Sequence, residues 1–168
     1  EKLIIAQQLE KLKIDVIEAG FAASSPGDWE GVNLIANSVK GSTIASLARC
    51  VQDDIDQAWE AIQAAARPRI HVFLSTSDIH LMHQLRKNRE EVMDMAVASV
   101  TRARRYCDDV EFSPMDATRT EPEYLFAMLK ACIDAGATTI NIPDTVGYTT
   151  PGEFTQLLEG IKANVPNI

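Results

Sequence analysis

Two patterns of apolar and polar positions take turns along the chain. In the first pattern, apolar residues recur every three or four positions, which is typical of a helix with one buried face. In the second, short runs are rich in Val, Ile and Thr, which is typical of strands. The first pattern predicts helices over residues 1–12, 26–38, 53–66, 77–85, 89–106, 121–135 and 152–163. The second predicts strands over residues 14–18, 43–48, 70–74, 110–113 and 138–142.

One stretch near the end of the chain combines several of these signals. Gly136 is expected to close a helix, because glycine tolerates the left-handed conformation found at helix ends. The β-branched run 138–142 then predicts a fully buried parallel strand. Residues 143–145 read Pro-Asp-Thr, which ends that strand and places polar side chains beyond its carboxyl end. Pro151 stands where the next helix is expected to begin.

The predicted strands begin about 30 residues apart, with one longer interval. A regular alternation of strand and helix predicts a parallel sheet with right-handed crossovers. Both the doubly wound sheet and the β/α barrel are built this way. The residues after the first predicted strand, 18–25, read Glu-Ala-Gly-Phe-Ala-Ala-Ser-Ser and do not match the Gly-rich dinucleotide fingerprint. The doubly wound sheet is therefore the weaker interpretation.

Side chains within the predicted strands also favour a barrel. In and just after the strand at 70–74, Val72 and Leu74 alternate with the mixed set His71, Phe73 and Ser75, and the strands at 110–113 and 138–142 repeat this pattern. In a barrel, the apolar set faces the surrounding helices and the mixed set faces the interior. We expect a partial β/α barrel of about five parallel strands. It forms a single domain over residues 1–168 that lacks the first and last strands of a full barrel.

Composition excludes several classes of function. The 168 residues carry a net charge of −8, which argues against binding to nucleic acid or to an anionic membrane surface. No apolar run approaches the roughly 20 residues of a membrane span. Cys50, Cys107 and Cys132 are widely spaced and fit no ligand motif, so free thiols and a reducing, cytoplasmic location are expected.

Four motifs occur in an order that resembles a known family. They are Val-Ile-Glu-Ala-Gly-Phe at 16–21, His-Val-Phe-Leu-Ser-Thr-Ser at 71–77, Val-Glu-Phe-Ser-Pro at 110–114 and Asn-Ile-Pro-Asp-Thr-Val-Gly at 141–147. Together they resemble the 2-isopropylmalate synthase family, which belongs to a wider group of metal-dependent barrels. The group includes homocitrate synthase, citramalate synthase and hydroxymethylglutaryl-CoA lyase. The resemblance covers essentially the whole chain.

The resemblance implies a Claisen condensation in leucine biosynthesis. In that reaction acetyl-CoA attacks the ketone of 2-oxoisovalerate, and hydrolysis of the thioester releases 2-isopropylmalate and CoA. A divalent metal, Mg, Mn or Zn, holds the 2-oxoacid in this family and polarises its carbonyl. The family's metal ligands lie in an Arg-Asp-Gly-Glu-Gln loop and a His-x-His motif, and neither occurs here. We therefore expect no metal ligand and no catalytic residue in this chain, and negligible synthase activity from it alone.

The resemblance still implies a substrate pocket. Thr145 matches the family residue that hydrogen-bonds the carboxylate of the 2-oxoacid. Other pocket positions match His71, Ser113, Asn141 and Pro143. Weaker candidates at the same face are Glu18, Arg49 and Met115. Met115 departs from the family, which has Glu there, and a thioether is a poor hydrogen-bond acceptor. The identity of the 2-oxoacid stays open, so a citramalate-type or homocitrate-type synthase is an alternative.

The remaining polar residues have simpler interpretations. His80 and His83 stand three positions apart on a predicted helix, but no third ligand accompanies them and surface positions are expected. Glu111 is expected to form an interior hydrogen bond or ion pair. A solvated helix face near a helix C-terminus is expected for Arg102, Arg104 and Arg105. Ordinary first-turn positions at the start of a helix are expected for Asp53, Asp54 and Asp56.

Two hypotheses therefore remain. In the first, the chain is the central part of an acyltransferase barrel. In the second, it is a stable non-catalytic α/β module that binds a partner or itself. Strands 14–18 and 138–142 are expected at open sheet edges, which invite pairing with another chain. A homo-oligomer is predicted under both hypotheses, with a dimer as the simplest form.

Overall fold

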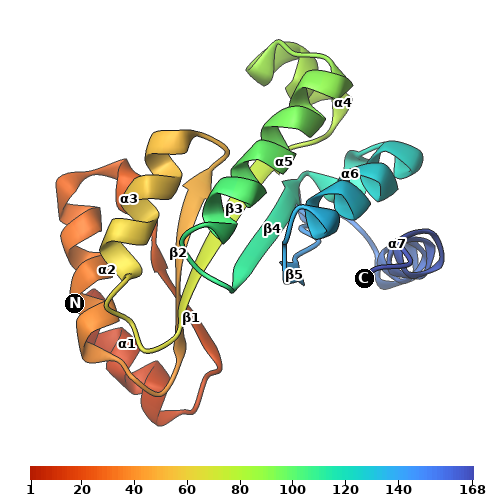
Figure 1. Cartoon of the computed structure of the whole chain (residues 1–168). Helices are drawn as coiled ribbons and strands as arrows, with labels where there is room; N and C mark the ends of the chain where they lie inside the picture. The colour runs from red at the N-terminus through yellow and green to blue at the C-terminus, as the bar shows by residue number, and fades with distance from the viewer.

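Five parallel strands form one sheet whose spatial order, β1-β2-β3-β4-β5, equals their order along the chain (Figure 1). The computed structural model describes all residues, 1–168. The strands are β1 (Val16–Gly20), β2 (Thr43–Arg49), β3 (Pro68–Ser75), β4 (Val110–Met115) and β5 (Thr139–Ile140). Each strand pairs in parallel with the next, as the βα repeat predicts.

Helices connect the strands at all the predicted positions. They are α1 (Lys2–Lys11), α2 (Pro26–Ser38), α3 (Gln52–Ile62), α4 (Asp78–His80), α5 (Arg89–Arg104), α6 (Pro122–Asp134) and α7 (Pro151–Asn164). Short turns of other helix types are η1 (Ala22–Ser24), η2 (Leu81–Leu85) and η3 (Ala117–Arg119). The single helix predicted over 77–85 is thus α4 followed by a π-helical turn, η2. None of the helices is long and apolar enough to cross a membrane.

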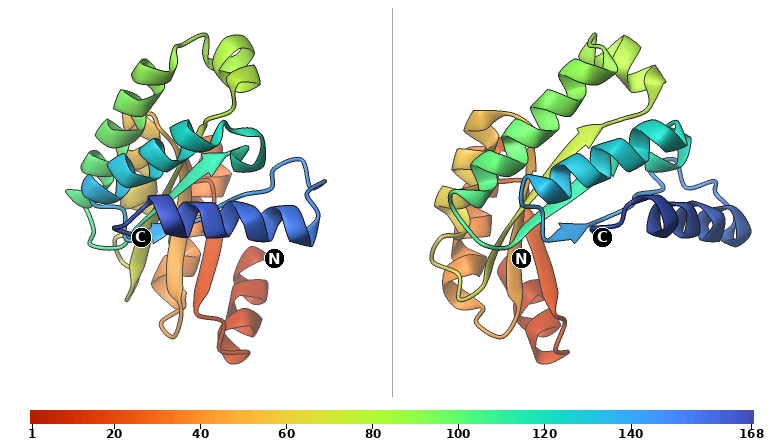
Figure 2. Two further views of the ribbon diagram at one scale, coloured as in Figure 1. Left: turned by 90° about the vertical axis from the view of Figure 1, so that its right-hand side faces the viewer. Right: turned by 45° about the vertical axis from the view of Figure 1, so that its right-hand side comes forward.

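The helices α2, α3, α5 and α6 lie along one face of the curved sheet (Figures 1 and 2). The core lies between these helices and the strands. Val72, Val110 and Phe112 are completely buried in it, as the apolar set of the alternation predicts. The mixed set therefore projects from the opposite, inner face, which is the side that a closed barrel would enclose.

Sequence signals at the helix ends have the expected structural roles. Ser25 accepts a hydrogen bond from the backbone N–H of Asp28 at the start of α2. Pro151 is the first residue of α7, and Thr150 and Glu153 form a capping box there. Gly136 adopts φ +114° after α6, so the predicted helix stop is confirmed.

The prediction of a fully buried strand at 138–142 is wrong. β5 has only two residues, Thr139 and Ile140, and both are half-buried. The physical reason is that β5 has a neighbour on one side only, because β4 pairs with it and no strand lies beyond it. The β-branched composition indicates a local preference for extended backbone, but it does not determine how deeply the strand is buried.

All three cysteines are buried and free, as the sequence predicts. Burial raises the pKa of the Cys50 thiol to about 12, although a hydrogen bond with Ser99 opposes the shift. Burial likewise raises the pKa values of Cys107 and Cys132. These thiols are therefore packing residues and not nucleophiles.

Candidate functional site

A chain of hydrogen bonds crosses the inner face of the sheet and joins four of the predicted pocket residues. His71 on β3 contacts the carboxylate of Glu18 on β1 through Nδ1. Its Nε2 lies 2.6 Å from the Ser113 hydroxyl on β4. The Asn141 amide, just after β5, donates to the same hydroxyl at 2.9 Å. His71 and Ser113 are buried, whereas Glu18 and Asn141 are exposed.

The directions of these hydrogen bonds follow from the donors available. Asn141 Nδ2 donates to Ser113 Oγ, so the Ser113 hydrogen is free to point at His71 Nε2. The remaining hydrogen of a neutral His71 ring is then on Nδ1 and points at Glu18. The four side chains therefore form one connected polar line, with an exposed amide at one end and an exposed carboxylate at the other.

Glu111 has the interior ion pair that the sequence predicts. Its Oε2 lies 3.2 Å from Arg69 Nη1, and its Oε1 lies 3.7 Å from His71 Nε2. Arg69 also contacts Asp109 at 2.9 Å. The Glu111 carboxylate thus lies next to His71 and has a structural role through its ion pair with Arg69.

Thr145 lies in the loop after β5, where it is exposed. Its Oγ1 accepts a hydrogen bond of 2.9 Å from the backbone N–H of Asp116. The Thr145 hydrogen remains available for a ligand, and carboxylates are acceptors of such hydrogens. Pro143 is half-buried and lies three residues beyond the end of β5, so the strand stops earlier than the sequence predicts.

Asp144 shapes the same loop. Its carboxylate accepts from Thr118 Oγ1 at 3.1 Å and from the backbone N–H groups of Gly147 and Thr149 at 3.2 and 3.0 Å. Partial burial would raise the pKa of Asp144, but the hydrogen bonds, led by that of Thr149, hold the pKa below its usual value. The loop that carries Thr145 is therefore tied by side-chain contacts to η3 and to Asp116, the residue after β4.

Arg49 ends β2 at the carboxyl edge of the sheet, as expected, but it is already paired. Its Nε and Nη2 bind the two oxygens of Asp54 at 2.6 and 3.0 Å. Its guanidinium also lies 5.4 Å from the centre of the Phe21 ring. Asp54 lies in the first turn of α3, as predicted, and is only 4% exposed. The carboxylate enters the protein because Arg49 neutralises it.

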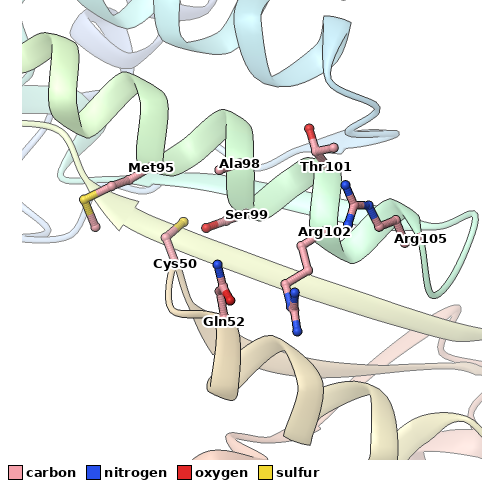
Figure 3. A pocket seen from close by; sticks show the side chains of 8 residues that line it. All are labelled: Cys50, Gln52, Met95, Ala98, Ser99, Thr101, Arg102 and Arg105. Carbon is pink, nitrogen blue, oxygen red and sulfur yellow. The ribbon is translucent and has the colours of Figure 1, made fainter.

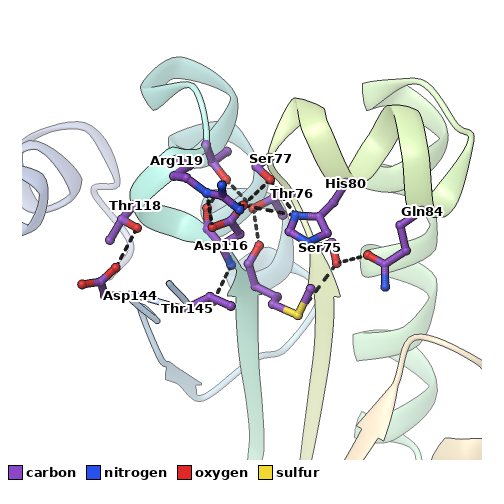
Figure 4. Close-up of polar contacts among 12 residues, drawn as sticks. Ser75, Thr76, Ser77, His80, Gln84, Asp116, Thr118, Arg119, Asp144 and Thr145 are labelled. Atoms are coloured by element: carbon purple, nitrogen blue, oxygen red, sulfur yellow. Dashed lines mark hydrogen bonds and ion pairs between the residues drawn. The ribbon is translucent and has the colours of Figure 1, made fainter. Parts of the chain in front are cut away.

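A second polar cluster lies at the carboxyl ends of β3 and β4, and sequence reasoning missed it (Figure 4). At its centre the fully buried Asp116 adopts a left-handed backbone with φ +69°. Its carboxylate contacts Ser77 Oγ at 2.5 Å, His80 Nδ1 at 3.1 Å and Arg119 Nε at 2.8 Å. Burial would raise the pKa of Asp116, but the hydrogen bonds from Arg119 and Ser77 lower it below its ordinary value.

His80 is therefore not the surface residue that its sequence position predicts. Its side chain is only 25% exposed, and its Nδ1 also lies 2.9 Å from Ser77 Oγ. His83, by contrast, is exposed as predicted. A polar Asp directly after a predicted strand was the available signal for this cluster. The bend in the backbone that brings Ser77 and His80 to Asp116 leaves no such signal.

Met115, the departure from the family motif, is half-buried at the end of β4. It pairs in register with Ser75 of β3, and the Ser75 hydroxyl lies 3.9 Å from its sulfur. The same hydroxyl donates to Gln84 Oε1 at 2.9 Å. This part of the inner face is lined by a thioether, a hydroxyl and an amide, and Met115 supplies no carboxylate.

The residues present do not fit a divalent metal site. No group of three or more His, Cys, Asp or Glu side chains is arranged to hold a metal ion. On the inner face of the sheet, the His71 imidazole already uses both ring nitrogens for contacts with Glu18 and Ser113.

A separate hollow of about 440 Å³ lies between α3 and α5 (Figure 3). Arg102 borders it but is paired with Asp56, with N–O distances of 2.7 and 2.5 Å, and Asp56 also accepts from Tyr106. The prediction that Arg102 is solvated is therefore wrong, since it is half-buried in this ion pair. Asp56 lies beyond the first turn of α3 in which the sequence predicts it. Arg105 is exposed and Asp53 lies in the first turn of α3, as predicted.

Arg104 also departs from the prediction of a solvated helix face. Its side chain lies against Gly136, where an added Cβ would stand 2.5 Å from Arg104 Cγ. Its Nη1 forms an ion pair with Asp108 at 3.2 Å. Arg104 thus packs on the junction between α6 and β5.

Known proteins resemble this chain over its whole length. The 2-isopropylmalate synthases of Syntrophus aciditrophicus and Ruminiclostridium cellulolyticum are 60% and 56% identical over 168 residues, which is 100% of this chain. The chain spans about a third, 33%, of the length of each relative. The predicted resemblance to the synthase family is confirmed.

Structural similarity confirms the predicted barrel architecture. The crystal structure of hydroxymethylglutaryl-CoA lyase from Pseudomonas aeruginosa matches 98% of this chain and 57% of its own, with a TM-score of 0.76 and 20% sequence identity. At that identity the likeness concerns the fold alone. The HMGL-like family model matches residues 1–168. The chain therefore belongs to the HMGL-like family.

Proposed function

We propose that this chain forms the 2-oxoacid-binding wall of an acyltransferase barrel of the 2-isopropylmalate synthase type. The observation that carries the proposal is the polar line of Glu18, His71, Ser113 and Asn141, which runs across the inner face from β1, over β2, to β3, β4 and the residue after β5. The names of relatives up to 60% identical support the reaction type. In that reaction, acetyl-CoA condenses with 2-oxoisovalerate during leucine biosynthesis.

The proposed substrate position follows from the donors that remain free. The Thr145 hydrogen is available for the carboxylate of the 2-oxoacid, because the Thr145 oxygen is the acceptor in its contact with Asp116. The exposed amide of Asn141 has a second N–H for the same ligand. Pro143 and His71 would border the substrate. A divalent metal supplies Lewis-acid polarisation in this reaction class, and its ligands would have to come from outside this chain.

Calorimetry of the chain with 2-oxoisovalerate tests the pocket directly. We expect weak binding that does not depend on magnesium or zinc. Ser113→Ala and Asn141→Ala should each weaken it by about fivefold to tenfold, the equivalent of one hydrogen bond. His83→Gln, a change at an exposed residue outside the pocket, should leave it unchanged. Absence of binding, or tight binding only with metal, would contradict the proposal.

The side chain of the 2-oxoacid is set partly by Met115. Because Met115 offers a thioether in place of the family's Glu, citramalate-type and homocitrate-type specificity are the alternatives. Titration with pyruvate and with 2-oxoglutarate under the same conditions ranks these candidates. Tighter binding of either would replace 2-oxoisovalerate as the proposed substrate.

We expect no measurable synthase turnover from this chain alone, because its donor set does not fit a metal centre. Release of CoA from acetyl-CoA and 2-oxoisovalerate is the assay. Metal-dependent CoA release clearly above the no-enzyme blank would refute this expectation.

We also propose that residues 1–168 act as one domain in the cytoplasm and self-associate, most simply as a dimer. One continuous core and three free thiols support the first two points. β1 and β5 each have a single partner strand, and Ile4 and Ile5 of α1 are 63% and 60% exposed. Such edges and apolar side chains favour contact with a second copy. A monomeric mass by light scattering at micromolar concentration would contradict the dimer.

A further inference from the structure

The hollow between α3 and α5 is separate from the inner-face site. It lies between Gln52, the first residue of α3, and one face of α5 that carries Met95, Ser99 and Arg102 (Figure 3). Both helices cover the outer face of the sheet, so the strands stand between the hollow and the polar line of the inner face. Its volume of about 440 Å³ is in the range of pockets that bind small molecules.

The charged residues around the hollow are both basic. They are Arg102 and Arg105, and no Asp or Glu side chain lines the hollow, although the chain has a net charge of −8. Asp56 balances the charge of Arg102 through contacts with Nε and Nη2, at 2.7 and 2.5 Å. Arg105 is exposed and pairs with no carboxylate. The rim of the hollow therefore carries one uncompensated positive charge.

Ser99 supplies a buried hydroxyl on the inner side of the hollow. The residue is only 7% exposed, and Figure 3 shows its oxygen turned toward Cys50 and Gln52. The Cys50 thiol is the only group of the chain that hydrogen-bonds to this hydroxyl. A thiol is a weak hydrogen-bonding partner, and a buried polar group without a good partner costs free energy. The hydroxyl of Ser99 is therefore ready to donate to a stronger acceptor.

The start of α3 adds hydrogen-bond donors at the same place. Val51 occupies the N-cap, and its side chain cannot accept from the first turn. The backbone N–H of Gln52 therefore has no partner in the chain, and the positive end of the helix dipole borders the hollow. Asp54 in this turn is neutralised by Arg49, and Asp53 does not line the hollow.

These groups share one chemical preference. The Arg105 guanidinium, the Ser99 hydroxyl and the Gln52 amide all have hydrogens that no oxygen of the chain accepts. A guanidinium can bind two oxygens of a phosphate or carboxylate at once. A metal cation would meet no carboxylate here, and Met95 and Ala98 offer apolar contact to the carbon part of a ligand. The lining therefore favours a small anion with oxygen acceptors.

We propose that this hollow binds a small oxyanion, a phosphate or carboxylate group, between Arg105 at the rim and Ser99 within. Gln52 donates from the opposite wall. Asp56 holds the Arg102 guanidinium through Nε and Nη2, so its Nη1 remains a further donor. The site uses no residue of the 2-oxoacid pocket and does not depend on the proposed function.

Nitrogen-15 NMR of the whole chain, titrated with sodium phosphate, tests the site. Sodium chloride keeps the ionic strength constant, so that general screening does not contribute to the signal changes. We expect the backbone signals of residues 50–52 and 98–105 to shift and to saturate in the millimolar range. A parallel titration with sodium acetate distinguishes the two oxyanions, and the tighter one identifies the class of ligand.

Two arginine variants separate the site from general charge attraction. Arg105→Gln removes the free guanidinium and should weaken phosphate binding about tenfold, the loss of a charge-assisted hydrogen bond. Arg86→Gln is the matched control, because Arg86 is also exposed and without a carboxylate partner but lies before the other end of α5. It should bind phosphate like the unmodified chain. Ser99→Ala should weaken the binding about fivefold, the equivalent of one hydrogen bond.

Equal phosphate affinities of Arg105→Gln and Arg86→Gln would overturn the proposal, and so would shifts that fail to saturate or that chloride alone reproduces. The calorimetric ligand 2-oxoisovalerate is itself a carboxylate, so its binding is also measured with Arg105→Gln. Loss of that binding in Arg105→Gln but not in Asn141→Ala would place the compound in the hollow and exclude the inner-face pocket. Loss in Asn141→Ala alone would support the inner-face pocket, and the phosphate titration then decides the hollow independently.

Discussion

The central strands of the sheet and the last unit, β5 with α7, have similar sequences but differ in how far neighbouring segments bury them. β3 lies between two strands and beneath α3 and α5, and Ile70 and Val72 within it are completely buried. β5 has one neighbour, and α7, which follows it, buries only Ile161. Figure 2 shows α7 beside the edge of the sheet and not stacked on its centre. The difference shows that a strand's burial depends on its neighbours on both sides as much as on its own residues.

The same isoleucine substitution in the two regions gives the largest expected contrast. Ile70→Ala opens a cavity in a close-packed core and should lower the free energy of unfolding by about 4 kcal/mol. Ile140→Ala on the half-covered β5 should cost about 1 kcal/mol, because solvent and neighbouring side chains can fill the space. Denaturant unfolding followed by circular dichroism measures both. Equal losses would show that β5 is as well packed as β3.

Two glycines test the junction between these regions. Gly136 has φ +114° and would place a Cβ 2.5 Å from Arg104 Cγ, so Gly136→Ala should destabilise by about 2 kcal/mol. Gly152 is in the first turn of α7 with nothing within 4 Å of an added Cβ. Gly152→Ala should stabilise by about 0.5 kcal/mol, because alanine has less backbone freedom to lose. Thermal unfolding measures both variants, and we expect a lower melting temperature for Gly136→Ala and a higher one for Gly152→Ala. A shift in the same direction for both variants would contradict these different roles of the two glycines.

The smallest expected effect concerns the tie between the loop after β5 and β4. Thr145→Val removes the acceptor of the Asp116 backbone N–H and should cost about 1 kcal/mol. Hydrogen exchange followed by mass spectrometry should show faster exchange in residues 141–150, with β3 unchanged. Faster exchange throughout the sheet would mean that the loop after β5 stabilises the central strands as well.

The residues on the inner and outer faces of the sheet could be predicted, because successive side chains of a strand alternate between the two faces. His71 and Ser113 follow that period, and the structure brings them within hydrogen-bond distance of each other. The pairing of Arg49 with Asp54 could not be predicted, because it depends on rotamers that bring two residues five positions apart into contact. The position of His80 depends on the turn after β3 and on the left-handed backbone of Asp116, which a non-glycine residue rarely adopts.

The burial of β5 could not be predicted for a different reason. A run of Thr and Ile records a preference for extended backbone at its own positions. Cover comes from segments elsewhere in the chain, and no local pattern contains that information. The loop at 143–145 was recognised through its motif, whereas its anchoring to Asp116 and Thr118 is a tertiary property.

The strand order has a consequence for how the protein is made. Because each strand pairs with the one synthesised just before it, every new unit emerging from the ribosome finds its docking surface already complete. Among β1 to β5, each pair of neighbouring strands is also adjacent along the chain, so few long loops need closing within this sheet. These five units can therefore assemble one after another in the direction of translation, with the β1 edge fixed and the other open edge moving along the sheet as synthesis proceeds.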